Sequence, residues 1–155
     1  MTGGVAADGD AHASDEASGH VGVTTLAGIV ALVAIPVAPA YWYSWRENRV
    51  ESTDRLDGLA VGLATLTAIV HLYLFFAHGE TVMLLAGGGF VGAIVLFLLG
   101  ANRRLLYLTG IPYTAVQLLL WINAGFPHAT GIGLVDKLAQ TALVGLLGYL
   151  YVADE

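Results

Sequence analysis

The sequence predicts an all-α integral membrane protein, a helical bundle of five transmembrane helices in which an N-terminal helix is added to a four-helix core. The first observation is composition: 57% of the 155 residues are hydrophobic and 12% are charged, whereas soluble domains carry about 25% charged residues. The second is a mean hydropathy of +0.73. The third is that apolar residues gather in five runs, each close to the roughly 20 residues that cross about 30 Å of hydrocarbon.

Residues 1–20 precede these runs. They are mostly small or acidic and contain no Lys or Arg. Such a segment buries too little apolar surface to fold, so we expect a disordered acidic tail. It also lacks the basic start of a signal peptide. The bundle is predicted over residues 21–155, with spans at about 22–45, 56–76, 81–100, 105–123 and 134–152.

The first predicted span ends in an aromatic cluster, YWYSW at 41–45, which is typical of the headgroup level of a membrane. Pro36 and Pro39 predict a bend just before it. The later spans carry glycines, which let membrane helices approach closely. We expect helix contacts at Gly58, Gly62, Gly87, Gly88, Gly89, Gly92, Gly145 and Gly148.

The connections between spans predict neighbours and orientation. Short turns at 77–80 and 101–104 predict that spans two, three and four are antiparallel neighbours in sequence order. All five arginines lie in two connections, one between the first and second spans and one between the third and fourth. The positive-inside rule places these connections in the cytoplasm. We therefore expect a multi-pass protein of the cell membrane with its N-terminus outside and its C-terminus cytoplasmic.

A histidine within the second span, His71, is the candidate centre of a polar site. A buried polar group in hydrocarbon needs a partner, and ionisable residues inside membranes are candidates for function. Most other polar residues of the spans gather at the same, outer end. The candidate site there comprises His71, His78, Glu80, Gln117, Trp121, His128, Asp136, Lys137 and Gln140. We expect the inner half to be apolar apart from its arginine rim.

Three interpretations of this outer end are open. In the first, which is the function that we predict, His71 bonds Gln140, Asp136 or a backbone carbonyl, and the protein is a non-catalytic accessory or structural membrane subunit. In the second, the polar residues form a ligand or ion site of a small transporter or sensor, in which a histidine can change charge between pH 5 and 8. A structural role predicts no cavity beside His71, whereas a transporter predicts a water-accessible path that reaches it.

In the third interpretation, His71 holds a haem or a metal ion. His71 and His78 lie about 10 Å apart along a straight helix, which is too far to share one ion bound at about 2 Å. Only His71 lies clearly inside a span, whereas a bis-histidine haem needs two such residues. We therefore predict no resident cofactor.

Charge and missing motifs disfavour other classes of function. A net charge of −6 with one lysine disfavours nucleic-acid binding, which needs a basic surface. The chain has no cysteine, so disulfides and thiolate chemistry are excluded. It also lacks the P-loop, H-E-x-x-H and G-x-S-x-G motifs. We predict no catalytic residues, and as partners we expect the lipid bilayer and either another membrane protein or a second copy of the chain.

Several stretches carry a family resemblance: AIVHLYLFF, the glycine-rich span after it, YTAVQLLLW and GLVDKLAQTALVGLL. Over residues 56–152 the chain resembles a group of small uncharacterised prokaryotic membrane proteins with a four-helix core, common in haloarchaea. The resemblance picks out His71, Trp121, Asp136, Lys137 and Gln140. Related sequences often carry Glu where this chain has Gln140, and a neutral amide weakens a proton-relay role for that helix. The family has no established activity, so the resemblance implies a fold and no mechanism.

Overall fold

The computed structural model describes residues 10–47, 54–126 and 131–153, with side chains from residue 22 onward. Over these residues the chain forms five helices and no strand. They are α1 (Asp10–Arg46), α2 (Arg55–His78), α3 (Thr81–Leu98), α4 (Arg103–Asn123) and α5 (Ile132–Ala153). The prediction of an all-helical bundle is confirmed, and the boundaries of α2, α3, α4 and α5 lie within a few residues of those predicted.

Four helices are long and apolar enough to cross a membrane: Gly22–Arg46 within α1, together with α2, α3 and α4. The fifth helix, α5, is of similar length. It differs in carrying Asp136, Lys137 and Gln140 within its first turns, which lower its hydropathy.

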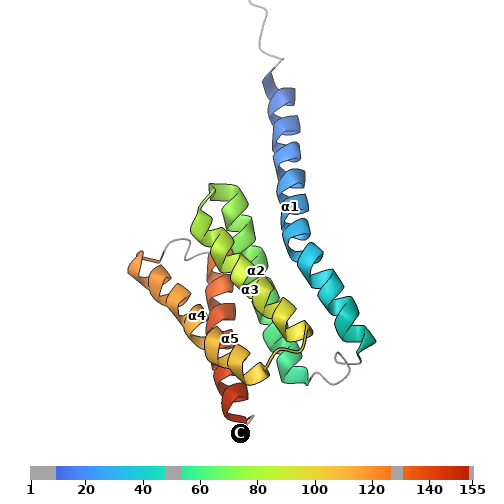
Figure 1. The fold of residues 1–155 in the computed structure, drawn as a ribbon. Coiled ribbons are helices and arrows are strands. Elements are labelled where there is room, and N and C mark those ends of the chain that lie inside the picture. Colours follow the sequence, from blue (N-terminus) through green and yellow to red (C-terminus); the bar gives the residue numbers. More distant parts are fainter. Residues whose placement is uncertain (1–9, 48–53, 127–130, 154–155) are drawn as a thin grey trace, which may run out of the picture.

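Helix α1 begins at Asp10, well before the predicted start near residue 22. The structure describes a helix over residues 10–20, where the sequence predicts a disordered tail, and residues 1–9 lie outside the described chain. Low hydrophobicity argues against packing, but extending an existing helix costs far less than nucleating one. In Figure 1, α1 projects beyond the other four helices at its N-terminal end.

Local signals set the ends of the helices. Asp54 caps α2 by accepting a hydrogen bond from the Arg55 backbone N–H at 2.7 Å. Gly79 ends α2 at φ 74°, a left-handed conformation that favours glycine, and its N–H donates to the Phe75 carbonyl. Asn102 caps α4 by accepting from Leu105 N–H at 3.2 Å.

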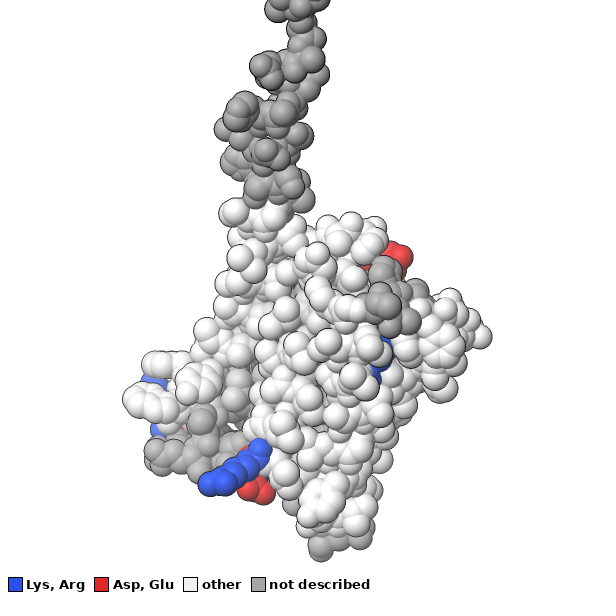
Figure 2. Space-filling view, turned by 180° about the vertical axis from the view of Figure 1, so that it is seen from behind, with Lys and Arg blue, Asp and Glu red and all other residues white. Residues whose placement is uncertain are grey.

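These turns alternate the helix directions, so the ends of the helices gather at two ends of the bundle (Figure 1). One end holds the C-termini of α1, α3 and α5 with the N-termini of α2 and α4. We call it the arginine end, because Arg46, Arg55, Arg103 and Arg104 lie there. The opposite end, nearer to His71, is the histidine end. On the face drawn in Figure 2, charged side chains are few and the flank between the two ends is uncharged.

Helix α2 is central: it packs against α3 and α5, while α4 packs against α5. Helix α1 lies outside, on α2 and α3. Helices α3 and α4 are consecutive but touch each other only sparsely, and α2 and α4 do not approach closely within the described residues. Spans two and three are the neighbours predicted, whereas the main neighbour of α4 is α5. The short α3–α4 turn fixes direction but leaves the helices free to diverge.

Most of the glycines predicted as helix contacts face open space. Around Gly58, Gly62, Gly88, Gly92, Gly145 and Gly148, an added Cβ would meet no described atom within 4 Å. Those six predictions are wrong, because spacing along a helix does not say which side faces a neighbour. Gly87 and Gly89 do permit close approaches, the first by α2 at Leu72 and the second by α4 at Tyr113.

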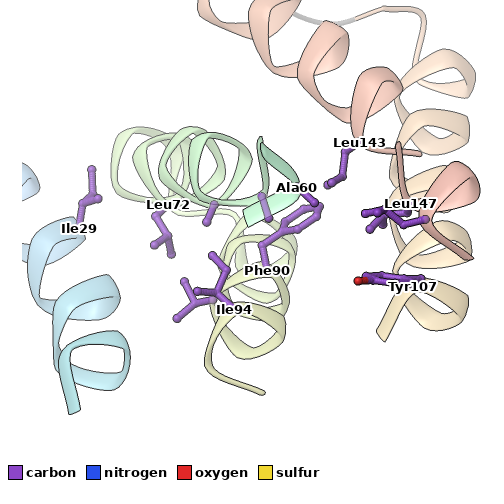
Figure 3. Packing of buried hydrophobic residues seen from close by; sticks show 12 residues of the cluster. Ile29, Ala60, Leu72, Phe90, Ile94, Tyr107, Leu143 and Leu147 are labelled. Atoms are coloured by element: carbon purple, nitrogen blue, oxygen red, sulfur yellow. The ribbon is translucent and has the colours of Figure 1, made fainter. Parts of the chain in front are cut away.

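The buried apolar core lies mainly between α2, α3 and α5, with Ile29 of α1 at one side (Figure 3). Its residues are Ile29, Ala60, Ala64, Ala68, Leu72, Phe90, Val91, Ile94, Tyr107, Leu143, Leu147 and Leu150. Because alanines line much of the buried side of α2, the larger side chains of α3 and α5 can pack close to its backbone.

Candidate functional site

A cavity of about 510 Å³ lies among α2, α3, α4 and α5 toward the histidine end. Its residues are His71, Leu74, Glu80, Val82, Met83, Ala86, Gln117, Leu120, Trp121, Asn123, Ala124, Gly133, Asp136 and Lys137, and we call it the His71 cavity. Glu80, Asn123 and Ala124 are exposed, so the cavity opens at this end of the bundle. Its size is typical of small-molecule sites, which are about 300–1,000 Å³.

His71 is held on the wall of this cavity by its own helix. The residue is 4% exposed, and its Nδ1 lies 2.9 Å from the Thr67 carbonyl oxygen, one turn back along α2. A carbonyl can only accept, so Nδ1 donates in this bond, and Nε2 of the neutral ring is then an acceptor. Nε2 has no hydrogen-bond partner among the described residues. The ring therefore offers a lone pair to the cavity.

Asp136, 1% exposed, is the most deeply buried charge of the cavity. Its Oδ2 accepts from Lys137 Nζ at 3.0 Å and from Gln140 Nε2 at 3.0 Å. Lys137 Nζ also donates to Gln140 Oε1 at 3.2 Å. These bonds close a triangle on the first turns of α5 and compensate the buried carboxylate, which would otherwise be costly.

The other carboxylate oxygen of Asp136 is left over. Oδ1 is buried, lies 3.7 Å from His71 Nδ1, and has no hydrogen-bond partner among the described residues. Gln117 of α4 shows the same pattern: its Nε2 donates to the Tyr113 carbonyl at 3.4 Å, while its Oε1 is buried and unpartnered within the described chain. Buried acceptors without a donor are unfavourable by roughly 1–3 kcal/mol each.

Glu80 and Trp121 complete the chemistry of the wall. Glu80 precedes α3 and is exposed at the mouth of the cavity. The ring centroid of Trp121 lies 6.0 Å from Lys137 Nζ, within the range of a cation–π contact. The charged groups of the wall are thus the carboxylates of Glu80 and Asp136 and the ammonium of Lys137. With His71 neutral, the cavity is acidic and rich in acceptors.

One described residue of the predicted site, His78, does not line this cavity. His78 is exposed at the end of α2, and its Nδ1 lies 3.2 Å from the Leu74 carbonyl oxygen. His128 lies outside the described residues. The other seven predicted residues come together, six on the wall and Gln140 behind it. Among described residues, no group of three or more His, Cys, Asp or Glu side chains could hold a metal ion.

A second polar cluster, at the arginine end, was missed by the sequence analysis. Asp57 of α2 is buried, and its carboxylate accepts from Arg103 Nη1 at 2.6 Å and from the Tyr107 hydroxyl at 2.6 Å. The prediction of an apolar inner half is therefore wrong. The sequence did contain a signal for this cluster. Asp57 is an acidic residue in the first turn of α2, and Arg103 and Tyr107 lie one turn apart in α4. Pairing them requires knowing that α2 and α4 begin at the same end of the bundle, within reach of these long side chains.

Comparisons of this chain with protein-family models, with curated proteins and with solved structures found no match.

Proposed function

We propose that this chain is a small integral membrane protein that binds a small cation with hydrogen-bond donors in the His71 cavity. The observation that carries the proposal is the pair of buried, unpartnered acceptors, Asp136 Oδ1 and Gln117 Oε1, on residues that wall a cavity of about 510 Å³. The proposal corresponds to the transporter or sensor alternative considered from sequence.

The membrane topology we propose has five spans. Four helices have the length and hydropathy to cross. Helix α5 packs along α4 and α2, and its Asp136 and Gln140 are buried inside the bundle rather than turned to lipid, which supports a fifth crossing. With the arginine end in the cytoplasm, the His71 cavity would open to the outside and the C-terminus would be cytoplasmic.

The chemistry of the wall supports the ligand class. The wall carries two carboxylates, those of Glu80 and Asp136, and one ammonium, that of Lys137. A cation is therefore favoured over an anion. Asp136 Oδ1, Gln117 Oε1 and His71 Nε2 all accept hydrogen bonds, so the ligand should donate them. The remaining wall is largely apolar, and Trp121 offers a ring face to a cation.

The alternative is the accessory or structural subunit predicted first from sequence. Two features fit it: His71 Nδ1 and the Lys137 ammonium both have protein partners. A purely structural role gives no function to the cavity beside His71 or to the two unpartnered acceptors, Asp136 Oδ1 and Gln117 Oε1. For this reason we place ligand binding first and keep the structural role as the alternative that the experiment tests.

Equilibrium binding of radiolabelled guanidinium to the purified protein in lipid nanodiscs tests the proposal. Guanidinium is a cation that donates hydrogen bonds and accepts none, and tetramethylammonium is a cation with no donor. We expect guanidinium to bind at least tenfold more tightly than tetramethylammonium. Asp136→Asn should weaken binding about tenfold or more, because hydrogen bonds to charged groups contribute roughly 1.5–3 kcal/mol.

Asp54→Asn is the matched control, since it makes the same chemical change at an exposed helix cap at the opposite end. It should bind guanidinium as the wild type does. Absence of guanidinium binding by the wild type, or equal binding by Asp136→Asn, would overturn the proposed ligand site and leave the structural role as the better account.

A further inference from the structure

A second, smaller cavity lies among the same four helices, toward the arginine end. It has a volume of about 80 Å³, and its wall includes Asp57, Ala64, Phe90, Tyr107, Tyr113 and Thr114; we call it the Asp57 cavity. A cavity needs roughly 10–15 Å³ of such volume to hold one water, so this space admits several. The Thr114 hydroxyl is buried on its wall without a hydrogen-bond partner among the described residues.

The two cavities follow one another along the same helices. On α3, Ala86 faces the His71 cavity and Phe90, one turn on, faces the Asp57 cavity. On α4, Gln117 belongs to the first and Thr114, less than one turn away, to the second. One helical turn is about 5.4 Å, so the cavities lie end to end with a thin partition. The sparse contact between α3 and α4 leaves room for both.

The partition is built around the ring of Phe90, which is 3% exposed. Its centroid lies 6.2 Å from the His71 ring on one side and 5.3 Å from the Tyr113 ring on the other. Figure 3 shows the ring pointing from α3 across the bundle toward Leu143 and Leu147. Thr67, between the two stretches of α2 that wall the cavities, is fully buried, and its hydroxyl also lacks a partner in the described chain.

An ion pair between Asp57 and Arg103 lies at the arginine end of the Asp57 cavity. The Asp57 carboxylate is buried on the cavity wall, whereas the Arg103 side chain is 39% exposed. One partner of the pair therefore faces the cavity and the other reaches the surface. Unpartnered or charged acceptors thus occur at successive levels, from Asp136 and Gln117 through Thr114 to Asp57.

We propose that the two cavities are halves of one path across the bundle for a small hydrogen-bond-donating cation, closed in this structure by the Phe90 ring. The chemistry of the passenger rests on the proposed function, and the small volume of the Asp57 cavity limits it to an ion of a few heavy atoms, such as guanidinium. The Phe90 ring lies between two spaces that each have an acidic residue in their lining, Asp136 in one and Asp57 in the other, so displacing that one ring would join them.

Uptake of radiolabelled guanidinium into proteoliposomes, driven by a membrane potential negative inside, tests this path. Phe90→Ala should raise the initial rate at least tenfold over the wild type. Phe76→Ala is the matched control, because it removes the same ring from α2 at a position that lines neither cavity; it should match the wild type. Adding Asp136→Asn to Phe90→Ala should return uptake to less than a third of the Phe90→Ala rate.

Tetramethylammonium distinguishes a selective path from a leak. If Phe90→Ala admits both cations equally, or if a folded Phe90→Ala protein raises guanidinium uptake no more than Phe76→Ala does, the path is overturned. Phe90→Leu serves where Phe90→Ala does not fold, with a smaller rise expected. Binding of guanidinium without faster uptake in these variants would reject the path alone, whereas absence of binding by the wild type would reject the proposed function.

Discussion

Gly89 lacks a side chain at the point where the Tyr113 hydroxyl reaches α3. That hydroxyl donates to the carbonyl oxygens of Leu85 and Ala86, each at 3.0 Å, and a Cβ at Gly89 would occupy its position. Because α3 and α4 touch sparsely elsewhere, this single side chain is a main tie between them. It also lies beside Phe90, where the two cavities meet.

Gly89→Ala should lower the free energy of unfolding by about 1–2 kcal/mol, the scale of a side-chain hydrogen bond inside a membrane. Gly88→Ala is the control, since a Cβ there meets nothing within 4 Å, and it should be neutral or slightly stabilising. Unfolding in a denaturing detergent measures both. If the clash with Tyr113 is the cause, Gly89→Ala should cost nothing further in a Tyr113→Ala background, which removes the whole ring; a full additional loss there would contradict this account.

At the scale of helices, α2 and α4 are joined by side chains rather than by backbone proximity. Asp57 binds Arg103 and Tyr107 of α4, although the two helices do not approach closely in the described chain. Asp57 is buried and Arg103 is partly exposed. Removing either partner therefore has different consequences: a freed Arg103 can reach water, whereas a freed Asp57 carboxylate stays buried.

Arg103→Ala should accordingly destabilise the protein by about 2 kcal/mol, and more than Asp57→Ala does. The neighbouring Arg104 is exposed, with its guanidinium 5.0 Å from the ring centroid of Tyr151. Arg104→Ala should cost no more than about 1 kcal/mol. The same unfolding measurement compares the three variants. Equal losses for Arg103→Ala and Arg104→Ala would show that the buried pair with Asp57 does not join the helices.

For the whole molecule, the difference between the two ends of the bundle is the basis for the proposed membrane orientation. The alternation of helix directions brings the described arginines to one end and the mouth of the His71 cavity to the other. A bundle with one basic end is typical of a membrane protein whose basic end faces the cytoplasm. In the topology proposed above, the His71 cavity would receive the proposed cation from outside the cell.

Single cysteines test this topology directly, because the chain has none of its own. A membrane-impermeant maleimide should label Thr81→Cys in intact cells, and should label Glu47→Cys and Ala153→Cys only after permeabilisation. Labelling of Ala153→Cys in intact cells together with Thr81→Cys would show that α5 does not cross. Labelling of Glu47→Cys and Ala153→Cys without Thr81→Cys would reverse the orientation.

Sequence alone determined the helices and much of the candidate site. Helix length and apolar composition are local properties matched to the thickness of a bilayer, so α2 to α5 could be delimited closely. Seven of the nine candidate residues could be grouped because they lie at the same end of their spans. The start of α1 could not be predicted, since a helix can continue beyond its apolar part.

Only the tertiary structure decided which faces meet. The rotation of each helix about its axis sets whether a glycine touches a neighbour, so Gly89 is a contact and Gly88 is not. The same rotation turned Asp57 toward Arg103, and it left space beside His71 and behind Phe90. Such contacts join residues far apart in the chain, and small differences in packing among apolar helices determine them. Neither spacing nor composition records those differences.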